Sequence, residues 1–232
     1  MKLTANSAAV QEGRTVFVKK VFDVTKYHSN IIKSADHNIK LGKGKYKIKK
    51  GRWKGLPMFS LTLEERKTCP FTCQHWTDCY GNGMNYGHRF KADKNLIPRI
   101  KYELEQLSQR YPKGFVIRLH ILGDFYSLEY VGAWESFLEQ YLGLRIFGYT
   151  AHTSGPMYIK ISNLRRRFGD RVWLRYSKNA AHNDKAPNIM YAVGQEFKGT
   201  SFTCPEILGK TESCLTCAAC FQTKKSVKFL DH

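Results

Sequence analysis

The grouping of the cysteines constrains this chain more than any other feature of its sequence. Three of the seven cysteines, Cys69, Cys73 and Cys79, have the spacing C-x3-C-x5-C in TCPFTCQHWTDCYGNG, whose proline and glycines predict a loop. Thiolates bind zinc and iron–sulfur clusters, normally in sets of four. A set of three therefore predicts a site with one open position, for water, a substrate or a cofactor. As an alternative, His75 in the same loop would complete a closed Cys3His zinc site.

The other four cysteines form a second set, in CPEILGKTESCLTCAAC near the end of the chain. They have the spacing C-x9-C-x2-C-x2-C and are Cys204, Cys214, Cys217 and Cys220. Four thiolates suffice for a cluster or for a closed structural zinc site. The alternative is that free cysteines are simply small buried apolar side chains. Disulfides are not expected, because no apolar signal segment opens the chain and 232 residues need no such staples.

The composition indicates a folded and strongly basic protein. Hydrophobic residues make up 42% of the chain and aromatic residues 13%, which argues against a disordered chain. Lys and Arg number 38 against 19 acidic residues, a net charge of +19. Such an excess favours DNA or RNA as a partner, through neutralisation of phosphates, and the alternative is a basic surface without that role. No run approaches the roughly 20 apolar residues of a membrane span, so we expect a soluble protein in a reducing compartment.

The densest charge lies in IKLGKGKYKIKKGRWKG, residues 39–55. Lysines alternate there with Tyr46 and Ile48, which predicts a half-exposed strand or ribbon. Its charged face would follow phosphates and an aromatic ring would stack on a base, whereas an edge strand protected by lysines is an equal alternative. The residues expected to contact nucleic acid are Lys43, Lys45, Lys47, Lys49, Lys50, Arg52 and Trp53.

Strand and helix patterns alternate through the middle of the chain. Strands are expected at residues 15–24, 56–63, 115–122, 144–150, 171–176 and 190–193. Helices are expected at residues 94–111, 127–141 and 156–168. This order predicts an α/β protein, with a partial (βα) barrel or an open parallel sheet and a cysteine-rich C-terminal segment. We expect one compact domain in three parts: basic N-terminal strands and arm (1–60), the α/β core with the three-cysteine loop (61–200), and a metal- or cluster-binding tail (201–232).

Ligands of parallel α/β proteins gather at the carboxyl ends of the strands. Candidate cofactor-binding residues at these positions are His120, Gly123, Asp124, Thr150 and Arg175. Since His120 and Arg118 are two apart in one expected strand, their side chains should share a face and line a polar cavity. The alternatives are a plain tight turn at Gly123 and Asp124, and a core histidine whose hydrogen bonds are satisfied.

The order of four motifs resembles a known family. TCPFTCQHWTDCYG, then RLHILGDFYSLEYVGAW, then FGYTAH, then the C-terminal cysteines are similar to the phage gene-product-88-like family, over roughly residues 38 to 222. A cysteine triad in a loop after an early strand also resembles the radical S-adenosylmethionine superfamily. The commonest spacing there is C-x3-C-x2-C, and this chain differs by having five residues before Cys79.

The resemblance implies an iron–sulfur enzyme. A 4Fe–4S cluster would be held by the three-cysteine loop, and S-adenosylmethionine would bind beside Gly123 and Asp124 and be cleaved to a deoxyadenosyl radical. The C-terminal cysteines would hold a second cluster or a zinc ion. The basic charge points to a nucleic-acid substrate, and we expect the protein in the cytoplasm of a bacterial or phage-infected cell. The alternative function is a non-catalytic, metal-stapled nucleic-acid-binding protein.

Overall fold

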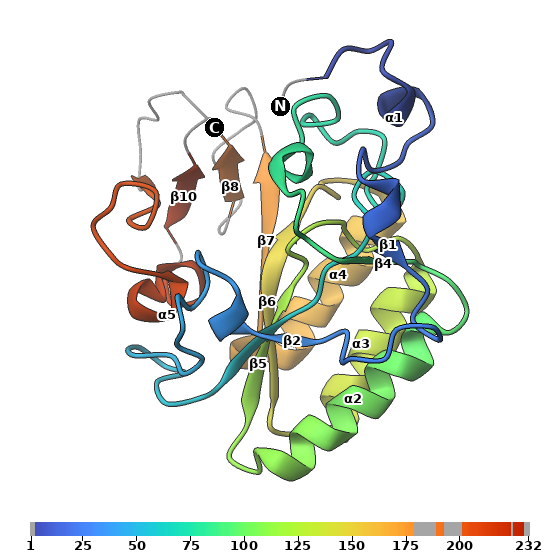
Figure 1. Cartoon of the computed structure of the whole chain (residues 1–232). Coiled ribbons are helices and arrows are strands. Elements are labelled where there is room, and N and C mark those ends of the chain that lie inside the picture. Colours follow the sequence, from blue (N-terminus) through green and yellow to red (C-terminus); the bar gives the residue numbers. More distant parts are fainter. Residues whose placement is uncertain (1–2, 179–188, 193–200, 224, 230–232) are drawn as a thin grey trace.

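The computed structural model describes residues 3–178, 189–192, 201–223 and 225–229. Within that part the main feature is an eight-stranded sheet (Figure 1). Its spatial order is β2 (Lys33–Ser34), β3 (Met58–Ser60), β5 (Phe115–Leu119), β6 (Leu144–Thr150), β7 (Val172–Lys178), β8 (Ile189–Ala192), β10 (Ser226–Phe229) and β9 (Ser201–Thr203). Every pairing is parallel except that of β2 with β3. A second, two-stranded parallel sheet joins β1 (Val21–Phe22) to β4 (Arg89–Phe90).

Three long helices cover one face of the large sheet (Figure 1). They are α2 (Leu96–Arg110), α3 (Leu128–Gln140) and α4 (Gly155–Phe168). The shorter helices are α1 (Ala8–Gln11), α5 (Cys214–Cys217) and the 3-10 turns η1 (Val18–Lys20), η2 (Ala35–His37), η3 (Tyr80–Gly83), η4 (Gly169–Arg171) and η5 (Ala219–Phe221). The start of α3 is fixed by Ser127, whose hydroxyl accepts the Tyr130 N–H at 3.1 Å.

Alternation along β5 explains how the sheet is buried on both faces. Phe115 and Ile117 pack in the core beneath the helices, whereas Val116 points into a second apolar cluster on the opposite face. In that second cluster, Trp53 from the basic segment and Leu215 from α5 cover the sheet. The basic segment and the C-terminal cysteine-rich segment therefore pack together on the face that the long helices leave free.

The expected α/β class and mostly parallel sheet are confirmed, and the described strands form no closed barrel. The helices expected at 94–111 and 156–168 and the strand at 144–150 lie where the sequence placed them. β8 ends at Ala192, and position 193 of the expected strand lies outside the described residues. Strands from all three expected parts of the chain share the large sheet. In the part of the chain that the structure describes, no helix is long and apolar enough to cross a membrane.

Two expected strands are wrong. Residues 15–24 contain a 3-10 turn and only the two-residue β1. Residues 39–55 are mostly turns, with one isolated bridge between Lys47 and Pro57. The basic segment does not extend because Ile48 is buried and the Lys49 N–H bonds to the Leu215 carbonyl at 2.9 Å. Its apolar residues are anchors on the sheet and on α5.

Candidate functional site

The three-cysteine loop follows β3 and lies beyond the carboxyl end of that strand, at the end of the sheet to which the arrows point (Figure 1). Cys69, Cys73 and Cys79 are all half-buried free thiols. The backbone N–H of His75 donates to the Cys73 sulfur, and the backbone N–H of Gly81 donates to the Cys79 sulfur. In each case the donor is two residues after the cysteine. Such N–H···S bonds favour a thiolate over a thiol.

Burial raises the pKa of all three thiols, that of Cys79 to about 11. The Asp124 carboxylate is a further cause that raises the pKa of Cys69 and Cys73, and Cys69 also interacts with the other two thiols. The Cys69 and Cys73 thiols therefore lie within electrostatic range of Asp124, and Cys69 lies within that range of the other two thiols. A cation would be needed to hold these thiols as thiolates at neutral pH.

A buried ion pair holds the end of the loop, after Cys79. The Arg89 guanidinium pairs with the Glu65 carboxylate at 2.7 Å, and neither side chain is more than 1% exposed. The same guanidinium donates to the carbonyls of Gly81 at 3.0 Å, Met84 at 3.0 Å and Gly87 at 2.6 Å. A Cβ at Gly81 would lie 2.6 Å from a Glu65 oxygen, so glycine permits this close packing.

A second buried arginine, Arg66, joins the middle of the loop to its end. Arg66 donates to the Trp76 carbonyl at 2.7 Å, to the Arg14 carbonyl at 3.1 Å and to the Asn82 side-chain oxygen at 2.6 Å. Its backbone has φ +63°, a left-handed conformation that costs a non-glycine residue energy and turns the chain into the loop. Two guanidinium groups thus hold the loop by carbonyl groups and by the Asn82 side chain.

The turn at Gly123 packs directly on the cysteine loop. Gly123 has φ +82°, and a Cβ there would lie 2.5 Å from the Thr68 hydroxyl oxygen. The Asp124 N–H donates to that same hydroxyl at 3.2 Å. The backbone at Gly123 therefore lies close to Thr68, the residue before Cys69.

Asp124 ties the end of β5 to the end of β6. Its buried carboxylate accepts the N–H groups of Phe125 and Ala151, both at 2.7 Å, and a hydrogen bond from the Thr150 hydroxyl. Burial raises its pKa, and His152 and these donors oppose that rise. Asp124 and Thr150 thus meet at the ends of adjacent strands, as expected, and Asp124 also contacts the three-cysteine loop.

His120 and Arg118 do not share a face, contrary to expectation. β5 ends at Leu119, so His120 turns toward α3, where its Nε2 is 3.0 Å from the Tyr130 hydroxyl. Arg118 lines a cavity on the opposite face of the sheet, among the C-terminal cysteines. Arg175 also lies on that opposite face, where it donates to the carbonyls of Cys220, Thr223 and Lys225. In this structure Arg175 therefore fixes the C-terminal segment and is not part of the rim.

His120 gives a testable pH dependence. Burial lowers its pKa to about 3, whereas a histidine in an unfolded chain has a pKa of about 6.5. Between these values the unfolded chain binds a proton that the folded chain does not, so stability is lost as pH falls through this range. We expect a slope of up to about 1.4 kcal/mol per pH unit in the free energy of unfolding, and His120→Leu should reduce it. Urea unfolding across the range measures both slopes, and equal slopes would contradict this assignment.

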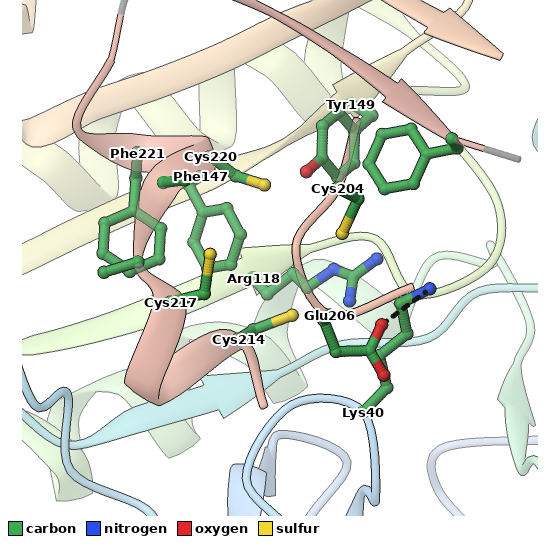
Figure 2. Close-up of a pocket in the computed structure, with 13 residues that line it drawn as sticks. Lys40, Arg118, Phe147, Tyr149, Cys204, Glu206, Cys214, Cys217, Cys220 and Phe221 are labelled. Carbon is green, nitrogen blue, oxygen red and sulfur yellow. Dashed lines mark ion pairs between the residues drawn. The ribbon is translucent and has the colours of Figure 1, made fainter. Parts of the chain in front are cut away.

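The four C-terminal cysteines line one cavity of about 20 Å³ (Figure 2). Its wall also contains Lys40, Arg118 and Tyr149. Among the residues that the structure describes, no three Cys, His, Asp or Glu side chains are positioned as a ready metal site, in this cavity or in the three-cysteine loop. Ligation at either place requires the thiol side chains to turn toward a common point.

The basic segment is partly used within the protein. Trp53 is 3% exposed and stacks on Phe221 with ring centroids 5.0 Å apart, so it is not available to stack on a base as expected. Lys45 pairs with Glu212 at 2.7 Å, and Arg52 pairs with Asp170. The exposed lysines of this segment are Lys43, Lys45, Lys47, Lys49, Lys50 and Lys54.

The two arginines that hold the cysteine loop have no recognisable signal in the sequence. Arg89 and its partner Glu65 are 24 residues apart, and neither position carries a spacing signal. Arg66 follows two glutamates in a stretch that reads as an exposed charged turn. Their hydrogen bonds to residues distant in sequence identify them in the structure.

The rim, the fold and the cysteine loop define a mixed α/β protein with a cysteine site at the carboxyl edge of a mostly parallel sheet. A family model described as Gene product 88 matches residues 31–198, and the chain belongs to this family. The matched residues include the three-cysteine loop and Asp124, and they end before Cys204.

Two phage proteins are similar to this chain. The Gene 88 protein of Mycobacterium phage D29 is 29% identical over 136 residues, which cover 52% of this chain and 56% of that protein. The Gene 88 protein of Mycobacterium phage L5 is 27% identical over 140 residues, with the same coverage. The similarity thus spans about half the length of the curated relatives. No solved structure was found to match the chain.

Proposed function

We propose that this chain is an iron–sulfur enzyme of the radical S-adenosylmethionine type that acts on a nucleic acid. The observation that carries the proposal is the contact between two neighbouring strand ends. The cysteine loop follows β3, and Asp124, which follows the adjacent parallel strand β5, interacts with the Cys69 and Cys73 thiols. A metal centre and a cofactor-binding turn would therefore share one rim.

The donor set fits a cluster with one open iron. Cys69, Cys73 and Cys79 would hold three irons, and the cluster would supply one electron to the sulfonium of S-adenosylmethionine. The chain's own part is orientation and exclusion of water. Arg66 and Arg89 hold the loop carbonyls, and the three thiol side chains would turn toward a common point to bind the cluster.

Reductive cleavage of the cofactor tests the proposal. Protein reconstituted with iron and sulfide without oxygen, then mixed with dithionite and S-adenosylmethionine, should release 5′-deoxyadenosine and methionine, measured by mass spectrometry. Absence of both products from protein with a full iron content would exclude this function. The non-catalytic, metal-stapled nucleic-acid-binding protein would then take its place.

The proposal of a nucleic-acid partner rests on the net charge of +19 and on the exposed lysines of residues 39–55. Changing three of them to glutamine should make the dependence of log K on log salt less steep by about 2, because each phosphate contact to a single strand contributes roughly 0.7. The test variant changes Lys47, Lys49 and Lys50. The matched control changes the exposed Lys94, Lys101 and Lys113. Fluorescence anisotropy with labelled single-stranded DNA or RNA measures the slopes, and equal slopes in both variants would remove residues 39–55 as the contact surface.

A further inference from the structure

The four C-terminal cysteines come from three places in the C-terminal segment and line one cavity. Cys204 follows β9, Cys214 and Cys217 are the first and last residues of α5, and Cys220 lies in η5. Ala218, with φ +55°, reverses the chain between Cys217 and Cys220 so that both face the cavity. Figure 2 shows their sulfurs on the walls of that cavity, above the sheet.

Two of these sulfurs accept hydrogen bonds. The Ala219 N–H bonds to the Cys217 sulfur from two residues ahead, the same geometry as at Cys73 and Cys79 in the other set. The Tyr149 hydroxyl bonds to the Cys220 sulfur. Hydrogen bonds of this kind are the outer partners that orient metal ligands and stabilise their charge.

Positive charge also faces the cavity. Arg118 lines it from β5, and its buried Nε atom has no hydrogen-bond partner within the described part of the chain. Lys40 lines it from the basic segment and pairs with Glu206 at 3.4 Å. Four thiolates around a divalent ion carry a net charge of about −2, and Arg118 would offset part of it, since Lys40 is already paired with Glu206, which also lines the cavity.

We propose that Cys204, Cys214, Cys217 and Cys220 bind a single zinc ion that fastens the C-terminal segment to the open face of the sheet. Four cysteines are a complete tetrahedral zinc set with no position for substrate. The cavity of about 20 Å³ has room for one ion, whereas a four-iron cluster would displace the rings of Phe147, Phe221 and Phe229 that line it. This site goes beyond the proposed function and uses none of the cysteines on which that function rests.

The zinc ion would join parts of the chain that are far apart in sequence. α5 is bonded to the basic segment through Leu215 and Lys49, and Arg175 of β7 holds the carbonyl of Cys220. The ion would lie among these contacts and stabilise them. The basic segment would then be held in place by the same site.

Metal analysis of the full chain, purified without added iron, tests this proposal. We expect one zinc per chain in the wild type, one in Cys73→Ser and none in Cys217→Ser, with a lower melting temperature for Cys217→Ser alone. Cys73→Ser is the matched control, because it makes the same change in the other cysteine set.

X-ray absorption at the zinc edge of the wild type keeps the test independent of how the variants fold. Four sulfur neighbours at about 2.3 Å are expected. Nitrogen or oxygen neighbours, a wild type without zinc, or iron and sulfide that depend on Cys217 would overturn the proposal. Loss of S-adenosylmethionine cleavage alone would leave it unaffected.

Discussion

Replacing Arg89 by methionine is expected to lower the free energy of unfolding by about 3–5 kcal/mol, the largest stability effect that the site offers. The change leaves the Glu65 carboxylate buried without its cation and releases three loop carbonyls from their donor. An uncompensated buried charge costs far more than the interaction of an exposed pair. Urea unfolding measures the change, and faster reaction of the Cys79 thiol with a thiol reagent would report loosening of the loop.

The matched control for this prediction is Arg167→Met. Arg167 pairs with Glu135 and is 56% exposed, so its loss should cost less than about 1 kcal/mol. Glu65→Gln in the Arg89→Met background should recover part of the stability, because it removes the buried charge. Equal losses for Arg89→Met and Arg167→Met would contradict the role given to the buried pair.

Replacing Cys79 by alanine is expected to abolish iron binding at the loop and cleavage of S-adenosylmethionine, while changing stability by no more than about 1 kcal/mol. The fold should tolerate the change because Arg66 and Arg89 hold the loop by its backbone carbonyls. A structural zinc site would behave in the opposite way, since removing one ligand would release the ion that holds the loop. Iron content, product analysis and a melting curve, measured on one preparation, distinguish the two outcomes.

The control for Cys79→Ala is Cys217→Ser in the C-terminal set. It should keep the iron of the loop and lose the zinc of the tail. If Cys79→Ala unfolds the chain, or if it retains cofactor cleavage, the enzyme proposal fails at the residue on which it depends.

The core of the fold was predictable because its signals are local. α2 buries Leu96, Ile100 and Leu104 at helical spacing, and Ser127 caps α3 as its side chain predicts. Apolar residues on both faces of β5 correctly indicated a sheet that is covered on two sides.

The structure of the basic segment was not predictable. The same alternation of lysine with apolar residues is compatible with an exposed ribbon and with an irregular segment that covers the sheet. What decides between them is the partner of Ile48 and Trp53, which comes from α5 and η5 near the other end of the chain. Tertiary contacts of this range leave no signal in a single sequence.

The candidate site was predictable in part. The spacing of the cysteines located both sets, and the strand-end rule brought Asp124 and Thr150 to the rim. That rule failed for His120 and Arg175 because the faces of their side chains depend on where each strand ends and on what covers it. The buried charges that hold the cysteine loop were found only in the structure.

Electron paramagnetic resonance of the reduced, anaerobically reconstituted protein tests the central claim most directly. The spectrum should show a 4Fe–4S signal that depends on Cys69, Cys73 and Cys79, and its shape should change when S-adenosylmethionine is added. The changed signal should persist in Cys217→Ser. A protein without an iron signal, or with a signal that S-adenosylmethionine leaves unaltered, would contradict an open cluster beside Asp124.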